Sequence, residues 1–270
     1  MVGTALPTIA VDIGNARIKL GLFVAGPCDD LPTPKDTLTL DGNRPQWARL
    51  ASWLEQLQQP QAAWWIGSVN RPVTTRLLDW IRDRRPADPA TLLAAGDLSL
   101  AVEVPRPDMV GIDRLLDAVA VNRLRRPGRP AVVADVGTAI TVDAISADGA
   151  FLGGAILPGI GMSARAFHEF TDLLPLIEMS ELATPPPALG TATEPAMRSG
   201  LYWGAVGAIR QLVGQLTADL GSDPEIFLTG GAGPAVAELL AATARHVPHL
   251  TLAGIALAAQ GQGGQAVNNE

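Results

Sequence analysis

The chain has little that covalent or metal-based chemistry could use. Cys28 is the only cysteine among 270 residues, which excludes an internal disulfide bond and a cysteine-rich zinc site. The three histidines, His168, His246 and His249, lack the spacing of metal ligands, and no serine lies in the sequence context of a hydrolase nucleophile. A Walker-type lysine loop is also absent, so the chain does not belong to that class of nucleotide-binding proteins.

Positive charge and long apolar runs are scarce as well. Lys and Arg number 20 against 27 Asp and Glu, a formal charge of −7, which disfavours nucleic acid as a partner. An anionic ligand therefore needs local positive ends, such as helix N-termini. No apolar run reaches about 18 residues, so no membrane span is predicted. The N-terminus lacks the layout of a secretion signal, and we expect a cytoplasmic protein.

Aliphatic material for a packed core is plentiful. Hydrophobic residues make up 47% of the chain, whereas aromatic residues make up only 4%. A length of 270 residues lies at the upper limit for one core and the lower limit for two compact domains. Composition alone therefore leaves both organisations open.

Two widely separated segments repeat one pattern: an apolar run, an Asp, an apolar residue, a Gly and a small polar residue. They are Asp12-Ile13-Gly14-Asn15 and Asp135-Val136-Gly137-Thr138, with their preceding runs. A buried strand that ends in Asp-x-Gly turns sharply, leaving a carboxylate and free backbone N–H groups suited to metal-bound phosphate. A single Asp of this kind could be a mere turn former. The repetition favours a duplicated pair of domains that binds one nucleotide.

Hydrophobic periodicity predicts a similar order of elements in each half. In the first half we expect a hairpin over 8–24, strands at 37–40, 62–69 and 98–104, and helices at 47–57, 74–84 and 112–124. In the second half we expect a hairpin over 131–145, strands at 151–157 and 225–229, and helices at 163–174, 195–220 and 234–245. This order indicates a mixed α/β duplication.

A loop rich in Arg, Pro and Gly, residues 125–130, gives the clearest linker signal. Arginines in such a loop are usually solvated rather than part of a binding patch. We expect an N-terminal domain over 1–120 with the first phosphate motif. A C-terminal domain over 121–260 would hold the second motif and an adenosine-binding turn, and the polar, Gly-rich residues 261–270 would form a flexible tail.

The segment Gly111-Ile112-Asp113-Arg114 opens a predicted helix and has two interpretations. Asp113 could simply favour the helix dipole, with Arg114 in a local ion pair. Alternatively, Asp113 accepts or orients a hydroxyl proton while Arg114 holds a substrate carboxylate with two hydrogen bonds. The residue types alone leave these alternatives open.

Three further glycine-containing segments could approach a ligand closely: residues 153–159, 190–193 and 228–233. A threonine in the second segment could cap the following helix or present its hydroxyl to a substrate. The Gly230-Gly231 turn lies between a predicted strand and a predicted helix, where a purine or a phosphate could lie against the main chain.

Taken in order, these segments resemble the type III pantothenate kinases, the bacterial enzymes that begin coenzyme A synthesis. The resemblance runs from about residue 9 to residue 257. The family's two phosphate motifs resemble Asp12 to Asn15, followed by Lys19, and residues 135–143. The resemblance implies the α/β architecture of the acetate and sugar kinases, actin and the heat-shock ATPases. That fold has two ribonuclease H-like domains, each a mixed sheet flanked by helices, with ATP in the cleft.

The same resemblance implies ATP-dependent phosphorylation of pantothenate to 4′-phosphopantothenate, with Asp113 as the base. Arg114 would hold the pantothenate carboxylate, helped by Thr193 of the facing subunit in a homodimer. Mg²⁺ would be placed by Asp12 through water, and a monovalent cation, K⁺ or NH₄⁺, by Asp135. The implied substrate-binding residues are Gly111, Ile112, Asp113, Arg114, Thr193 and Val104. The implied ATP-binding residues are Asp12, Ile13, Gly14, Asn15, Ala16, Arg17, Ile18, Lys19, Gly137, Thr138, Gly230 and Gly231.

Three positions depart from the family's pattern. Ala16 stands where a Thr or Ser is usual, Val104 where many members have a Tyr, and Ala232 where an Asp or Asn is common. A catalytically weak homologue with a regulatory role, or a kinase for another small hydroxyl-bearing metabolite, are the alternative hypotheses. The aspartates at positions 12, 113, 135 and 143, expected to converge on one cleft, favour the kinase.

Overall fold

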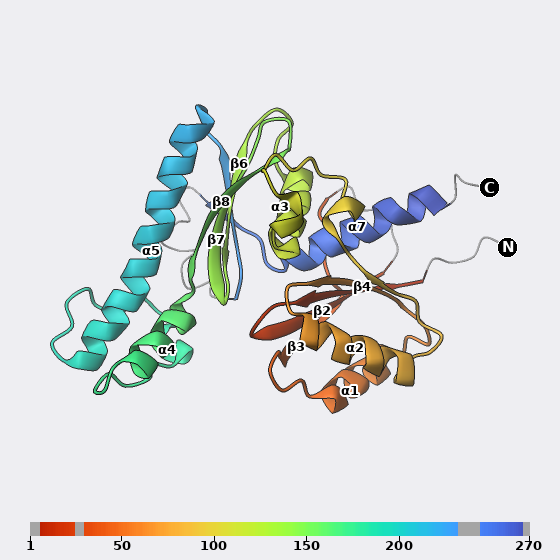
Figure 1. Ribbon diagram of the computed structural model, residues 1–270, viewed down its shortest axis with the longest axis horizontal. Coiled ribbons are helices and arrows are strands. Elements are labelled where there is room, and N and C mark those ends of the chain that lie inside the picture. The colour runs from red at the N-terminus through yellow and green to blue at the C-terminus, as the bar shows by residue number, and fades with distance from the viewer. Residues whose placement is uncertain (1–5, 25–29, 232–243, 267–270) are drawn as a thin grey trace. The chain divides into compact units, whose positions relative to one another are not determined.

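The computed structural model describes residues 6–24, 30–231 and 244–266, with side chains up to residue 261 (Figure 1). The chain divides into two compact units. The first comprises residues 1–101, 105–124 and 249–270, and the second comprises residues 102–104 and 125–248. None of the helices described is long and apolar enough to cross a membrane.

The first unit is built on a five-stranded mixed sheet in the order β3-β2-β1-β4-β5. Its strands are β1 (Thr8–Ile13), β2 (Arg17–Phe23), β3 (Asp36–Asp41), β4 (Ala63–Ser68) and β5 (Ala90–Leu92). The first three pair antiparallel, and β4 and β5 continue the sheet in parallel from β1. The register places Asp12 of β1 between Lys19 of β2 and Gly67 of β4.

Helices cover both faces of this sheet (Figure 1). Helices α1 (Trp47–Leu57) and α2 (Arg71–Arg84) pack on the face formed by alternate apolar residues of β1, such as Val11. Helices α3 (Ile112–Leu124) and α7 (Leu250–Ala266) pack on the other face, to which Asp12 belongs by alternation. A Cβ on Gly254 would lie 2.1 Å from the carbonyl oxygen of Leu116, so α3 and α7 meet backbone to backbone.

The second unit repeats this topology in the order β10-β9-β6-β7-β8. Its strands are β6 (Ala131–Val136), β7 (Ala139–Ile145), β8 (Phe151–Pro158), β9 (Glu225–Thr229) and β10 (Ala244–His246). Strands β6, β7 and β8 pair antiparallel, and β9 and β10 add parallel strands beside β6. Two sheets with the same pairings confirm the predicted fold class, a duplicated mixed sheet flanked by helices.

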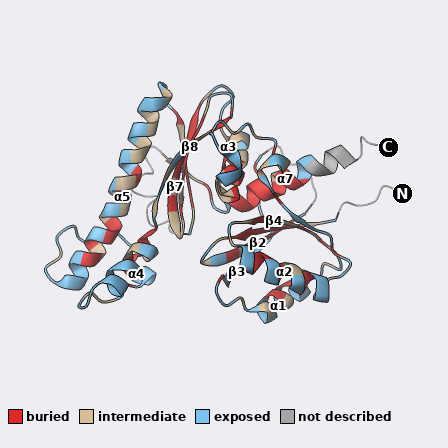
Figure 2. Ribbon diagram, viewed as in Figure 1, coloured by how far each residue is buried: buried red, intermediate tan, exposed pale blue. Residues whose placement is uncertain are grey.

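The core of the second unit lies between this sheet and the long helix α5 (Thr193–Leu220). Alternate residues of β6 and β7, such as Val132 and Val142, meet α5 there. Buried residues of α5 lie mainly in its N-terminal half, and its C-terminal end combines exposed with partly buried residues (Figure 2). Helix α4 (Ile160–Phe170) packs beside α5. The described part of the chain also contains three short 3₁₀ turns: η1 (Ala95–Asp97) and η2 (Pro107–Met109) in the first unit, and η3 (Met179–Leu182) in the second.

Most predicted elements are confirmed, and several need correction. Residues 98–104 do not form a strand; only Val102 makes an isolated bridge, to Phe151. Strand β5 and helix α7 were not predicted, and α4 ends at Phe170 rather than at residue 174. Of the helix expected at 234–245, residues 234–243 lie outside the described part, and Ala244 and Arg245 belong to β10.

The observed division of the chain also bears on the expected domains. The expected boundary at residue 120 falls inside α3, which belongs to the first unit together with α7. Helix α7 continues to Ala266, beyond residue 261, where the flexible tail was expected to begin.

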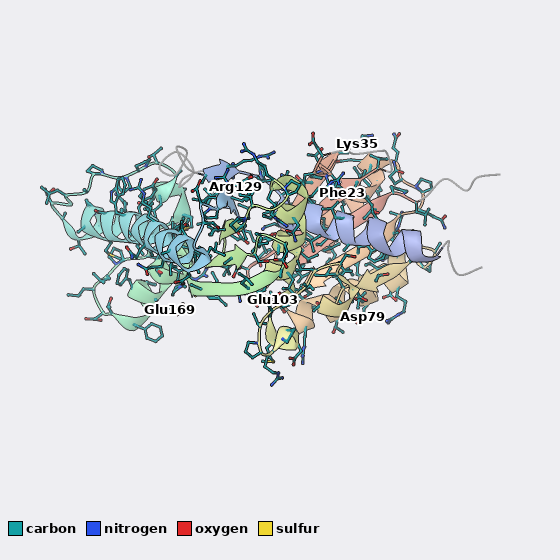
Figure 3. The ribbon with its side chains drawn as sticks, turned by 90° about the horizontal axis from the view of Figure 1, so that it is seen from above. Phe23, Lys35, Asp79, Glu103, Arg129 and Glu169 are labelled. Carbon is teal, nitrogen blue, oxygen red and sulfur yellow. The ribbon has the colours of Figure 1, made fainter. Side chains whose placement is uncertain are left out.

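The arginine-rich linker is tied to its own unit rather than only solvated. The Arg125 side chain donates 2.8 Å hydrogen bonds to the carbonyl oxygens of Arg129 and Ala147. Arg129, labelled in Figure 3, pairs with the carboxylate of Asp223, in the loop between α5 and β9. These contacts hold the linker against two other loops of the second unit.

Candidate functional site

The first phosphate motif lies where β1 turns into β2. The Gly14 N–H donates a 3.0 Å hydrogen bond to the Arg17 carbonyl, which closes the turn. Asp12 is only 8% exposed, and its Oδ2 lies 3.4 Å from the Lys19 Nζ on the neighbouring strand. Burial raises the pKa of the Asp12 carboxyl; Lys19 opposes this rise, and the charge of Asp113 adds to it. A buried carboxylate of this kind is stabilised by binding cations or hydrogen-bond donors.

The loop after β3 supports this turn from the side. The Gly42 N–H donates a 2.9 Å hydrogen bond to the carbonyl of Ala16. A Cβ at position 42 would lie 2.9 Å from the Ala16 carbonyl carbon, too close for real atoms. Glycine at this position is therefore required by the close approach of the two backbones. Sequence analysis missed Gly42, because a contact with a distant turn leaves no local signal.

Two of the predicted ATP-binding side chains are part of the hydrophobic core. Ile13 and Ile18 are fully buried among the residues under α1 and α2. They can therefore meet a ligand only through their main-chain atoms. Asn15 and Arg17 are exposed at the turn, and Gly14, Ala16 and Lys19 are partly exposed.

The second phosphate motif has a similar turn between β6 and β7. The Gly137 N–H donates a 3.0 Å hydrogen bond to the Ala139 carbonyl, and the Gly159 N–H donates one of 3.0 Å to the Thr138 carbonyl. A Cβ on Gly159 would lie 2.4 Å from the carbonyl oxygens of Gly137 and Thr138. The glycine that follows β8 thus supports the second turn, as Gly42 supports the first.

Glycine backbones surround the carboxylate of Asp135. Gly230 adopts a φ of +96°, and a Cβ there would lie 2.2 Å from the Asp135 Oδ1 and 2.5 Å from the Val136 carbonyl oxygen. Only glycine combines that conformation with that approach. Gly231 is exposed beside it. Ala232, one of the departures from the family's pattern, lies outside the described residues.

The predicted substrate motif opens α3 in the first unit. The Oδ1 of Asp113 accepts a 2.9 Å hydrogen bond from the Arg114 N–H, and a Cβ on Gly111 would lie 2.5 Å from that oxygen. Asp113 and Arg114 are both partly exposed, whereas Ile112 is buried. Because the Asp113 charge raises the pKa of Asp12, the two carboxylates act on one another within this unit.

One turn further along α3, a buried carboxylate anchors the helix. Asp117 is 2% exposed, and its Oδ1 accepts a 2.8 Å hydrogen bond from the Thr251 hydroxyl in the first turn of α7. The contact fixes α3 against α7 directly behind Asp113. An Asp on the apolar face of a predicted helix was the signal that could have identified Asp117. Nothing in the sequence identified its partner, Thr251.

The remaining predicted residues lie in the second unit. Val104 Cγ1 is 3.5 Å from where a Cβ on Gly153 would be, and Gly153 has a φ of +102°. Thr193 is the exposed first residue of α5; the cap position is Ala192, so no side chain caps this helix. Asp143 is 1% exposed on β7, opposite Gly154 of β8.

Each unit therefore contributes two of the four aspartates. Asp12 and Asp113 belong to the first unit, and Asp135 and Asp143 to the second. Their convergence on one cleft stays a prediction. Along the described ranges, no group of three or more His, Cys, Asp or Glu side chains could hold a metal by itself. A cation at either turn would share one carboxylate with phosphate oxygens, backbone carbonyls or water, a set that suits Mg²⁺ or K⁺.

Comparisons with known proteins agree with these motifs. A family model described as type III pantothenate kinase matches residues 8–215. A type III pantothenate kinase of Acidiphilium cryptum is 38% identical over 194 residues, 72% of this chain and 71% of that protein. One of Dehalococcoides mccartyi strain CBDB1 is 33% identical over 255 residues, 92% of this chain and 93% of that protein. The matched region contains both Asp-x-Gly turns and the Gly111 to Arg114 segment.

Solved structures support the fold. A putative 2-dehydro-3-deoxygalactonokinase from Sinorhizobium meliloti matches with a TM-score of 0.56 at 15% identity, covering 94% of this chain and 99% of that one. A putative N-acetylmannosamine kinase from Listeria monocytogenes matches with a TM-score of 0.53 at 14% identity, covering 95% and 100%. At such low identity the likeness concerns the fold alone.

Proposed function

We propose that this chain, which belongs to the type III pantothenate kinase family, carries out the family's reaction with the residues described above. The enzyme transfers a phosphoryl group to pantothenate in coenzyme A biosynthesis. ATP is the donor, and 4′-phosphopantothenate and ADP are the products. The main support for this conclusion is the family match over residues 8–215, a range that contains both Asp-x-Gly turns and the Gly111 to Arg114 segment.

Asp113 is the proposed base. The primary hydroxyl oxygen of pantothenate attacks the γ-phosphorus of ATP, and the bond from that phosphorus to the β,γ-bridging oxygen breaks. The electron pair of this bond leaves with ADP, and the hydroxyl proton passes to the Asp113 carboxylate. The Gly111 backbone and the Arg114 N–H hold that carboxylate at the start of α3. The Arg114 guanidinium would bind the pantothenate carboxylate with two hydrogen bonds.

The two Asp-x-Gly turns are the proposed phosphate sites. Backbone N–H groups around Asn15 and Thr138 and the Lys19 ammonium would bind phosphate oxygens. Asp12 would hold Mg²⁺ through water, and Asp135, within its glycine backbones, a monovalent cation. These cations would neutralise phosphate charge, and the chain's own part is to position the two reacting oxygens.

A homodimer is the proposed assembly. Eight exposed large apolar side chains belong to residues 156–189 of the second unit: Ile156, Met162, Phe167, Phe170, Leu173, Leu176, Met179 and Leu189. Concentrated apolar exposure of this kind marks interaction surfaces. The segment ends just before Thr193, which would help to hold pantothenate in the facing subunit. Cytoplasmic localisation is part of this proposal, because ATP and pantothenate are used there.

An ADP-release assay over a panel of hydroxyl-bearing metabolites tests the function. We expect ADP to form with pantothenate, Mg²⁺ and K⁺ or NH₄⁺ together, and only at background when pantothenate is withheld. Asp113→Asn should abolish turnover while thermal unfolding stays unchanged, because the exchange is nearly isosteric. Equal ADP release without pantothenate, or with another metabolite preferred over it, would overturn the proposal.

A further inference from the structure

The segment that leads from α4 to α5 folds back onto the first turns of α5. The Nη2 of Arg198, in the second turn of α5, donates hydrogen bonds to carboxylates of both Glu181 and Glu194. Glu181 belongs to η3 and Glu194 to the first turn of α5. We call these three residues the Arg198 clasp. It joins two pieces of chain on either side of Thr193.

Side chains of α5 also donate hydrogen bonds to backbone carbonyls of the segment that leads from α4 to α5. The Ser199 hydroxyl donates a 2.7 Å hydrogen bond to the Ala188 carbonyl, and the Trp203 Nε1 donates one of 2.9 Å to the Pro186 carbonyl. A Cβ on Gly190 would lie 2.2 Å from the Ala196 nitrogen, so the chain passes directly against α5 there. Three side chains of α5, those of Arg198, Ser199 and Trp203, thus hold residues 181–190 to the helix.

The charges explain why the clasp needs a cation. The Arg198 Nε is buried and has no hydrogen-bond partner within the described part of the chain, so the guanidinium has lost part of its hydration. Two carboxylates on one nitrogen compensate for that loss. A hydrogen bond from the Glu178 N–H and the nearby Arg198 lower the pKa of Glu181, which keeps it anionic at neutral pH. Without Arg198, two anions would face one another and push η3 away from α5.

We propose that Arg198 is a positioning residue for pantothenate. By holding η3 to the first turn of α5, it sets the place of Thr193 and the course of residues 183–192. This inference rests on the proposed function, in which Thr193 helps to hold pantothenate. The hydrogen bonds of the clasp lie between η3 and the first turns of α5, so we expect its effect to fall on one substrate only.

Steady-state kinetics of Arg198→Gln test the proposal. We expect the KM for pantothenate to rise about tenfold, while the KM for ATP stays within about twofold of the wild-type value. Arg198→Lys should recover part of the affinity, because an ammonium group can pair with one of the two carboxylates. Arg210→Gln, an exposed arginine further along the same helix, is the matched control and should match the wild type.

The double variant Arg198→Gln/Glu181→Gln separates positioning from a general loss of structure. If repulsion displaces η3, removing one of the two anions should lower the KM for pantothenate below that of Arg198→Gln alone. An equal rise of both KM values in Arg198→Gln, an unchanged KM for pantothenate, or additive losses in the double variant would overturn the proposal.

Hydrogen exchange gives a readout that does not depend on activity. In Arg198→Gln, and in Glu181→Gln if the former fails to fold, backbone amides of residues 183–192 should exchange faster, whereas those of β6 should not. If the wild-type enzyme did not phosphorylate pantothenate, the proposed function would be wrong, but the exchange measurement would still test the clasp. Unchanged exchange over residues 183–192 would refute the clasp itself.

Discussion

At Asp12, the proposed function and the stability of the fold make opposite demands on one residue. Its carboxyl is buried at the end of β1, and burial raises its pKa. Between the unfolded value and this raised value, the folded state binds more protons, so the free energy of unfolding falls as pH rises. Above the raised pKa, the destabilisation is complete. The proposed cation at Asp12 would offset this destabilisation.

The first prediction therefore concerns Asp12→Asn. We expect this variant to unfold at a higher temperature than the wild type at pH 7 without ligands, by about 2–4 °C for about 1 kcal/mol, and to lose phosphoryl transfer. Thermal unfolding between pH 4 and pH 8 measures the difference, which should grow as pH rises and then level off. Asp79→Asn, at an exposed ion pair, is the control. A variant less stable than the wild type throughout that range would contradict the argument.

Ala16 carries the second prediction at this scale. It lies in the predicted first phosphate turn, at a position where the family's pattern given above has a Thr or Ser, and so a hydroxyl. Ala16→Ser adds that hydroxyl without changing the backbone contact with Gly42. We expect the KM for ATP to fall about fivefold, in line with about 1 kcal/mol for one hydrogen bond, and the KM for pantothenate to stay constant. Ala16→Val, which adds bulk without a donor, should show no gain; an equal gain in both variants would exclude the hydrogen bond as the cause.

Among the elements, the two phosphate turns depend on glycines that lie outside the motifs. Gly42→Ala would bring a Cβ within 2.9 Å of the Ala16 backbone, which cannot yield as a side chain can. We expect the turn to shift, the KM for ATP to rise about tenfold or more, and stability to fall by about 1–3 kcal/mol. Nucleotide titration and thermal unfolding measure the two effects.

A matched substitution of glycine in α5 should have the opposite effect. Gly214 is exposed in the helix interior, and a Cβ there would meet nothing within 4 Å. Gly214→Ala should raise the free energy of unfolding by about 0.5–1 kcal/mol, because alanine favours the helix. ATP affinity should not change. If Gly42→Ala behaved like Gly214→Ala, the proposed support of the first turn by Gly42 would be wrong.

The elements also show which parts of the fold the sequence could predict. Helices α1 and α3 and strand β9 have the predicted bounds, because each carries a clear period and defined ends. Helix α7 could not be found in this way: residues 252–259 are apolar on all sides, since both α3 and the sheet cover them, and residues 260–265, which follow, are Gln and Gly. The alternation from Leu98 to Val104 suggested a strand, but only Val102 finds a partner.

The same difference between local patterns and long-range contacts applies to the candidate site. The Asp-x-Gly turns and the start of α3 are local arrangements, so residue types and spacing predicted where they occur. The roles of Asp113 and Arg114 were predicted only from the family resemblance. The contacts of Asp117 with Thr251 and of Gly42 with Ala16 join positions far apart in the sequence. Such contacts follow from tertiary packing, and no pattern within either segment predicts them.

For the whole molecule, duplication explains why the two predicted phosphate sites are built alike. Both units have the same strand order and the same pairings, and in each the first hairpin carries one Asp-x-Gly turn. Each turn is also held by a glycine from the loop that follows the third strand, Gly42 in one unit and Gly159 in the other. The units differ in their proposed parts in substrate binding. Asp113, the proposed base, belongs to the first unit, whereas Thr193 and the exposed apolar side chains before it belong to the second.

That surface leads to the last prediction, the disruption of the proposed homodimer. Phe170 and Leu173 are 84% and 86% exposed, an arrangement that is unfavourable in water unless a partner covers it. Phe170→Asp with Leu173→Asp should give a monomer in light scattering. Its pantothenate KM should rise more than its ATP KM, because Thr193 would have no facing subunit. Val24→Asp, at a 57% exposed apolar residue of the first unit, is the control and should leave assembly intact. A double variant that stays dimeric would place the interface elsewhere, whereas a fully active monomer would remove Thr193 of the facing subunit from the substrate site.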